Sequence, residues 1–185
     1  MRFIFSNLGL KQVEIKPEKF GRNKDEIKEG LEKHPDVLEK SERALGCLEE
    51  LMKQLGINHL WILPSQIALI PIMKFLYVNE VASPSELPRE DVERIENWLT
   101  LVSFSGYYSA QIYTKLDEDL ETVESSTNGF PFDKLLNNMR NRRANVKIRR
   151  DDLEKGLSTD VLLKTGKNYL FLLYALLIKN EADDW

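Results

Sequence analysis

The sequence contains very little cysteine and histidine. Its 185 residues include one cysteine, Cys47, and two histidines, His34 and His59. One cysteine excludes an intramolecular disulfide and a zinc site built on several thiolates. Two histidines leave little material for a histidine–carboxylate metal centre or for a Ser-His-Asp triad. We therefore predict no metal, no cofactor and no catalytic residues, and we interpret the chain as a protein that is not an enzyme on its own.

Long hydrophobic runs are missing as well. No uninterrupted apolar segment reaches the ~18–20 residues that a bilayer crossing needs. The N-terminus also lacks the apolar core and small-residue cleavage site of a secretory signal. A single free cysteine is typical of the reducing cytoplasm. The sequence thus predicts a cytoplasmic protein that does not interact with a membrane.

Charge is plentiful but almost balanced. There are 26 lysines and arginines against 30 aspartates and glutamates, so the net charge is −4. This excludes a uniformly basic nucleic-acid binder, but it allows a local basic face. A chain of this length corresponds to about one domain and buries roughly 70% of its unfolded surface, so it needs no metal or disulfide to fold.

Apolar residues recur at the i, i+3, i+4, i+7 spacing of helices through most of the chain. The segments predicted to be helical are 35–55, 66–78, 89–104, 114–123, 131–139 and 167–178. We predict an all-α fold, a single-domain irregular bundle of about six to eight helices. The helical domain is expected to span residues 35–185. Pro71 lies inside one of these segments, and we expect it to kink that helix.

The first residues show a different pattern. Phe3 and Phe5, followed by Val13 and Ile15, have a weak period of two, which predicts short extended pieces. Charged residues and two glycines come next. We therefore expect an extended, charged N-terminal segment at 1–34, in which residues 21–34 are a linker or an exposed helix.

Two clusters in the second half of the chain are interpreted as structural. Tyr107, Tyr108 and Tyr113 could stack on bases, but tyrosines next to a helix break are more often core and rim residues. An acidic group at 117–121 has no neighbouring histidine and no calcium-loop spacing. We predict that this group is a solvated helix face.

The strongest functional feature is a basic run that contains no acidic residue from Lys134 through Arg150. Its cations are Lys134, Arg140, Arg142, Arg143, Lys147, Arg149 and Arg150. Interleaved asparagines could donate hydrogen bonds to phosphate, sugar or base edges, and guanidinium groups suit phosphate oxygens. If 137–145 is helical, Arg140 and Arg143 form an i,i+3 pair.

This basic run has other interpretations. It could be a solvated surface, a patch that docks on the acidic stretch 117–124 of the same chain, or a surface for a partner protein. The sequence leaves these alternatives open.

Several motifs, in this order, carry a family resemblance. They are Trp61-Ile-Leu-Pro-Ser-Gln-Ile-Ala-Leu-Ile-Pro71, Trp98-Leu-Thr-Leu-Val-Ser-Phe-Ser-Gly106 followed by Tyr107-Tyr-Ser109, Thr114-Lys-Leu-Asp-Glu-Asp-Leu120, Leu172-Leu-Tyr174 and Ala182-Asp-Asp-Trp185. Together, residues 35–185 are similar to the helical region of the GmrSD-like proteins. That family has a ParB/sulfiredoxin-like N-terminal domain, and many members act in modification-dependent restriction and phage defence.

The resemblance implies a scaffold rather than a catalytic unit. The family's aspartate-glycine-glutamine-glutamine-arginine signature and its HNH-type nuclease module are absent from this sequence. No catalytic residue carries over. We therefore predict a non-catalytic helical scaffold or DNA-contacting module, with DNA and a ParB-like or nuclease domain on another chain as candidate partners. The alternative is a protein–protein interaction module whose basic face docks on an acidic partner.

Overall fold

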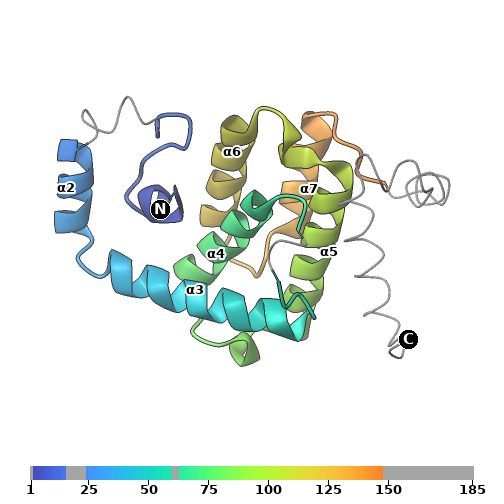
Figure 1. Cartoon of the computed structure of the whole chain (residues 1–185), viewed down its shortest axis with the longest axis horizontal. Coiled ribbons are helices and arrows are strands. Elements are labelled where there is room, and N and C mark those ends of the chain that lie inside the picture. Colours follow the sequence, from blue (N-terminus) through green and yellow to red (C-terminus); the bar gives the residue numbers. More distant parts are fainter. Residues whose placement is uncertain (1, 16–23, 60–62, 148–185) are drawn as a thin grey trace.

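The computed structural model of the chain describes residues 2–15, 24–59 and 63–147 (Figure 1). These residues form helices and no strand, so the predicted all-α class is confirmed. The α-helices are α1 (Arg2–Asn7), α2 (Lys24–Lys33), α3 (Val37–Gln54), α4 (Leu69–Val78), α5 (Arg89–Ser105), α6 (Ile112–Glu124) and α7 (Phe132–Asn141). Three 3₁₀ turns connect them, namely η3 (Gln66–Ala68), η4 (Pro84–Glu86) and η5 (Tyr107–Ser109). The helix predicted at 167–178 lies outside the described residues.

Helix α4 lies at the centre of the bundle. It packs against α3, α6 and α1, and in Figure 1 it crosses the middle of the molecule above α3. Ile72 and Leu76 of α4 are fully buried, as is Trp98 of α5. The indole Nε1 of Trp98 donates to the carbonyl of Ala68 at 3.1 Å. A helix that is apolar on nearly every side is expected in such a central position.

Pro71 does not kink a helix, contrary to the expectation from the sequence. The segment begins as the 3₁₀ turn η3, and the α-helix starts only at Leu69. Pro71 is therefore the third residue of α4, within the first turn, where backbone N–H groups have no partner inside the helix. A proline there removes no helical hydrogen bond, so a straight helix accommodates it.

The expected extended structure at the N-terminus is wrong for residues 2–7, which form α1. Phe3 and Phe5 are both buried, but they belong to different apolar clusters. Phe3 enters the main core and meets the ring of Tyr77 edge-on, with centroids 5.9 Å apart. Phe5 packs with Leu10 and Ile15. Because this short helix is covered on two sides, residues two apart are both buried, and the pattern imitates that of a strand.

A buried lysine connects α1 to the rest of the bundle. Lys74 on α4 has only 3% of its side chain exposed. Its Nζ donates to Oδ1 of Asn7 at 3.2 Å and lies 3.3 Å from a carboxylate oxygen of Glu124 on α6. The amide of Asn7 in turn donates to Ser41 on α3 at 3.3 Å. Four helices thus meet around one cation whose charge is compensated, as burial of a charge requires.

Candidate nucleic-acid interface

The described part of the basic run lies on α7 and on the loop that follows it. Lys134 and Arg140 are exposed on the helix, and Arg142, Arg143 and Lys147 come after its end. Arg149 and Arg150 lie outside the described residues.

Helix α7 corresponds to the helix predicted at 131–139 and ends at Asn141. An i,i+3 pair of Arg140 and Arg143 required helical structure over 137–145, but Arg143 lies beyond the helix end and has φ +57°. The N–H of Arg143 donates to the carbonyl of Arg140, and the N–H of Ala144 donates to that of Met139, both at 2.9 Å. These two bonds form a Schellman motif, which closes a helix with a left-handed residue. Arg140 and Arg143 are therefore not an i,i+3 pair on one helix.

Arg143 occupies a backbone position that favours glycine. The left-handed conformation costs an L-residue with a side chain about 1–2 kcal/mol, and in Schellman motifs that position is usually glycine. Ala144, the next residue, packs against the core, and this contact helps to hold the turn in place. The turn thus presents an exposed arginine at a strained position.

Arg142 differs from its neighbours because it is already paired. Its guanidinium contacts a carboxylate oxygen of Glu118 on α6 through Nε and Nη2, both at 3.0 Å. Each of the two side chains is about one third exposed. The acidic stretch 117–124 therefore does bind one member of the basic run.

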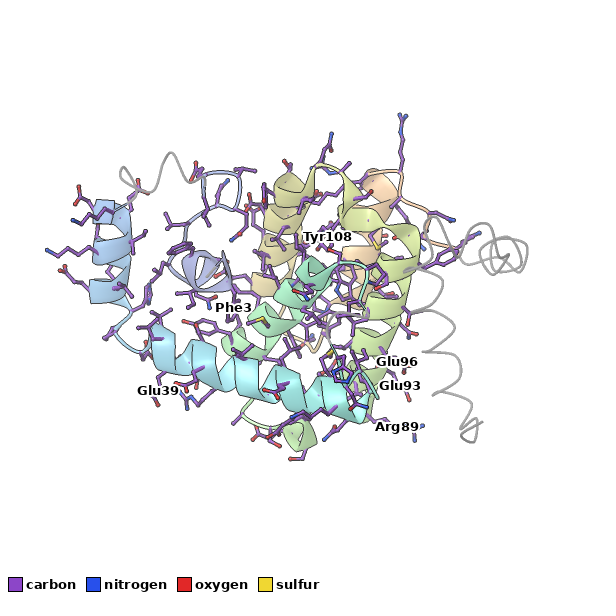
Figure 2. All side chains as sticks on the ribbon, viewed as in Figure 1. Phe3, Glu39, Arg89, Glu93, Glu96 and Tyr108 are labelled. Carbon is purple, nitrogen blue, oxygen red and sulfur yellow. The ribbon has the colours of Figure 1, made fainter. Side chains whose placement is uncertain are left out.

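The other described cations of the run have no such partner. Lys134, Arg140, Arg143 and Lys147 are exposed and form no ion pair with any described residue. The other lysines and arginines of α2, α3 and α5, Lys24 excepted, pair by contrast with carboxylates one turn away on the same helix. Figure 2 labels one such pair, Arg89 and Glu93 of α5.

These four cations do not all lie on one face. Six residues separate Lys134 from Arg140, which places them about 120° apart around an α-helix at ~100° per residue. Arg140, Arg143 and Lys147 follow one another at the helix end, where Arg140 Nη1 also donates to Oδ1 of Asn137 at 3.0 Å. We call Arg140, Arg143 and Lys147 the α7 basic end.

The contact between α6 and α7 depends on an acid that sequence reasoning missed. Asp119 was expected on a solvated face, but its side chain is fully buried. Its carboxylate accepts from the hydroxyl of Tyr108 at 2.6 Å and from the amide of Asn138 at 3.0 Å. Burial raises the pKa of Asp119 to about 7, although both hydrogen bonds act in the opposite direction. The sequence did contain a signal, because Asp119 follows Leu116 by three residues and precedes Val123 by four, within the buried stripe.

Asp117 is the second exception to the predicted solvated face. Its two carboxylate oxygens accept from the backbone N–H groups of Gln12 at 2.6 Å and Val13 at 3.2 Å. It therefore attaches the segment after α1 to α6.

The three tyrosines are core and rim residues, as predicted: two are buried and Tyr113 is partly exposed. Tyr107 and Tyr108 are 2% and 3% exposed and pack edge-on against Trp98; Figure 2 shows Tyr108 inside the bundle. Burial raises the pKa of both phenols. Tyr113 is 38% exposed. Neither buried ring is available for stacking on a base.

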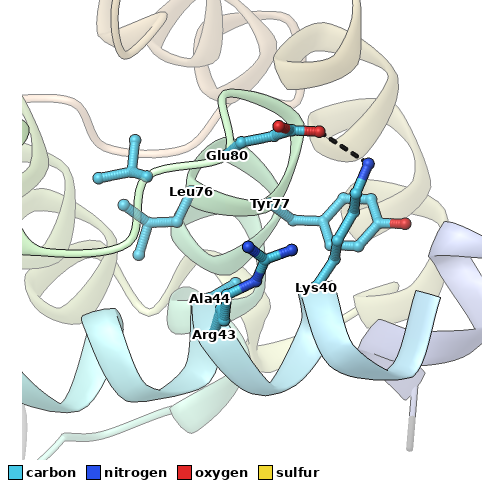
Figure 3. A pocket seen from close by; sticks show the side chains of 7 residues that line it. Lys40, Arg43, Ala44, Leu76, Tyr77 and Glu80 are labelled. Atoms are coloured by element: carbon cyan, nitrogen blue, oxygen red, sulfur yellow. Dashed lines mark ion pairs between the residues drawn. The ribbon is translucent and has the colours of Figure 1, made fainter. Parts of the chain in front are cut away.

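A small pocket between α3 and α4 carries charge but has no room for a ligand. Lys40 spans it, 3.0 Å from Asp36 and 2.7 Å from Glu80, with Arg43 and Tyr77 beside it (Figure 3). The enclosed space of about 10 Å³ suits a single water molecule. The hydrogen bond from Lys40 lowers the pKa of Glu80, so both groups stay ionised. Their ion pair connects α3 to the residues that follow α4.

The described residues offer neither a metal-binding cluster nor a membrane-spanning helix. They contain no group of three or more histidine, cysteine, aspartate or glutamate side chains arranged to hold a metal ion. None of the helices in these parts of the chain is both long and apolar enough to cross a bilayer.

Comparisons with protein-family models, with curated proteins and with solved structures find no match for this chain. Of the motifs that carry the resemblance to GmrSD-like proteins, Trp98, Tyr107 and Tyr108 are buried in the core. Trp61 and the motifs at 172–174 and 182–185 lie outside the described residues. The side chains of Trp98, Tyr107 and Tyr108 thus serve packing, and we infer a function from the surface of α7 instead.

Proposed function

We propose that the chain is a non-catalytic helical scaffold that contacts the phosphate backbone of DNA through the α7 basic end. One observation carries this proposal: Arg140, Arg143 and Lys147 are exposed and unpaired among the described residues. All but one of the cations on α2, α3 and α5 are compensated by acids on their own helix, the exception being Lys24. Positive charge without a carboxylate partner is what a phosphate contact requires, and it gives affinity without base specificity.

The local chemistry around these cations supports the same proposal. Two of the three are arginines, whose planar guanidinium forms bidentate hydrogen bonds with phosphate oxygens. Asn137 and Asn141 are exposed on the last turn of α7, and amide side chains commonly donate to phosphate and sugar oxygens. The helix end itself carries partial negative charge, which the arginines reverse.

The resemblance to GmrSD-like proteins extends this proposal to partners. On that basis we propose that the scaffold positions a ParB-like domain or a nuclease on another chain while its basic end holds the DNA. The chain's own part is limited to contact and positioning.

The test is binding of a labelled DNA duplex by fluorescence anisotropy at about 50 mM salt, where phosphate contacts are strong. The variant Arg140→Glu with Arg143→Glu is expected to weaken binding at least about tenfold, since two phosphate contacts become repulsive. The control is Arg43→Glu with Arg89→Glu, which changes the net charge equally but removes arginines that are paired on α3 and α5. Equal losses in both variants, or no binding by the native chain, would refute the proposal.

The pair between Arg142 and Glu118 favours a second candidate, a module that docks on an acidic protein surface. The basic run already binds one carboxylate in this way. Polyglutamate is a suitable probe for this alternative. Binding of polyglutamate that is tighter than that of DNA at equal salt, and sensitive to Arg143→Glu, would favour docking on an acidic partner over contact with DNA.

A further inference from the structure

Helix α3 has an apolar face that nothing in the described structure covers. Leu38 and Leu45 have 56% and 53% of their surface exposed, more than the other large apolar residues described. They are seven residues apart, so they follow each other along one side of the helix. A single exposed leucine is ordinary, but two leucines in line beside an apolar groove indicate an interaction surface for another segment or molecule.

The groove begins at Leu45 and continues to the end of α3. Its walls and floor include Leu45, Leu48, Met52 and Ile57, and it encloses about 250 Å³. Leu48, Met52 and Ile57 are themselves buried, so the floor is preformed. We call Leu38, Leu45 and this groove the α3 apolar face. Its chemistry suits several aliphatic or aromatic side chains from one segment.

The charge around this face selects for a basic occupant. On α3, Arg43 pairs with Glu39 and Lys53 pairs with Glu49. Glu42, one turn before Leu45 on the same side of the helix, is exposed and forms no ion pair with any described residue. The rim is therefore negative. A second copy of the chain would bring the same carboxylates against it, and like charges at an interface are unfavourable.

We propose that residues 161–179 of the same chain dock on the α3 apolar face. This segment lies outside the described residues, and its sequence fits both requirements. All ten residues from 169 to 178 are apolar, and Lys164, Lys167 and Lys179 are charged, with no aspartate or glutamate between 161 and 179. An apolar run of this kind gains stability by leaving water, and its lysines match the negative rim.

The connection is long enough to reach. The 13 residues 148–160 span about 45 Å when extended, at ~3.3–3.6 Å per residue. Helix α3, with 18 residues, is only about 27 Å long at ~1.5 Å per residue. The extended connection is therefore longer than α3 itself.

The test places a photo-crosslinking amino acid at position 45 of the full chain. Irradiation at low protein concentration is expected to link position 45 to residues between 161 and 179 of the same chain, identified by peptide mass spectrometry. In the same chain, Leu172→Asp is expected to lower the yield of this crosslink about tenfold or more, since burial of one leucine changes an equilibrium constant by that amount. The control places the crosslinker at Glu93, on the exposed side of α5, where no crosslink to 161–179 is expected.

Three results would overturn the proposal. Crosslinks from position 45 that join two chains would assign the face to a second copy. Capture of other segments, or the absence of any protein crosslink, would show that 161–179 does not cover it. A yield that is unchanged by Leu172→Asp would show a chance encounter rather than docking. Far-ultraviolet circular dichroism of each variant shows whether the bundle remains folded.

Discussion

At the residue scale, Asp119 shows how helical register decides the environment of one side chain. It lies among five acidic residues on α6, and composition alone predicts a solvated face. Its position relative to Leu116 and Val123 places it on the buried stripe instead, where it binds Tyr108 and Asn138. A helical projection would have found its burial. Its partners could not be predicted from the sequence, because they come from the turn η5 and from α7.

We predict that Asp119→Asn changes how stability depends on pH. Because the folded-state pKa of Asp119 is raised to about 7 from 3.8, the folded protein favours the protonated form. The stability that protonated Asp119 contributes to the fold is fully present below pH 3.8 and is lost as pH rises towards 7. An asparagine resembles the neutral acid at all pH values. The free energy of unfolding of the variant, relative to that of the native chain, should therefore rise by about 2–3 kcal/mol when the pH is raised from 5 to 8.

Urea unfolding of both proteins at pH 5 and pH 8 measures this difference. Other groups with shifted pKa values, such as Glu80, are common to the two proteins and cancel in the comparison. A constant difference between variant and native chain at the two pH values would contradict a raised pKa for Asp119.

Arg143 gives a prediction in which stability and binding move in opposite directions. Its φ of +57° suits glycine, so Arg143→Gly relieves backbone strain and should raise the free energy of unfolding by about 1 kcal/mol. The same change removes one cation of the α7 basic end and should weaken DNA binding. Thermal unfolding and anisotropy on the same sample provide both values. A stabilised variant with native affinity for DNA would show that Arg143 is not a contact.

At the element scale, helices were predictable and their ends were not. The segments at 35–55, 89–104 and 114–123 correspond to α3, α5 and α6 within a few residues, because their apolar spacing is regular. The segment at 131–139 likewise corresponds to α7, but the left-handed turn at Arg143 that closes this helix and the helix at residues 2–7 were not predicted. Both depend on tertiary contacts, the packing of Ala144 on the core in one case and the two-sided burial of α1 in the other.

Two glycines differ in what decides the effect of their replacement by alanine: at Gly46 it is helix preference alone, and at Gly129 it is a tertiary contact. Gly46 is exposed within α3, and a Cβ there would meet nothing within 4 Å. Gly46→Ala should therefore stabilise the protein by about 1 kcal/mol through helix preference. Gly129 has φ +66°, and a Cβ there would collide with the carboxylate of Asp91, which accepts from the N–H of Phe130 at 2.9 Å.

Gly129→Ala should destabilise the protein by about 2–4 kcal/mol, from the strained conformation and the disturbed hydrogen bond. Denaturant unfolding of both variants measures the two effects. If the two substitutions shifted stability in the same direction, the contact between the α6–α7 loop and α5 would not be as described.

At the scale of the whole molecule, charge is distributed unevenly although the net charge is only −4. Acids compensate cations along α2, α3 and α5. The basic run was evident from the sequence, since no acid interrupts it. Which of its members are available was not evident, because the partner of Arg142 is Glu118, 24 residues away. A sequence locates a run of charge, whereas long-range pairing decides which charges remain for a ligand.

The salt dependence of DNA binding tests the central claim most directly. Contacts from Arg140, Arg143 and Lys147 to three phosphates predict a slope of about −3 in log K against log salt, at ~0.9 per phosphate. With Arg140→Glu and Arg143→Glu the slope should fall to about −1, and it should stay near −3 with Arg43→Glu and Arg89→Glu. A slope near zero, or one that both variants change equally, would contradict the account.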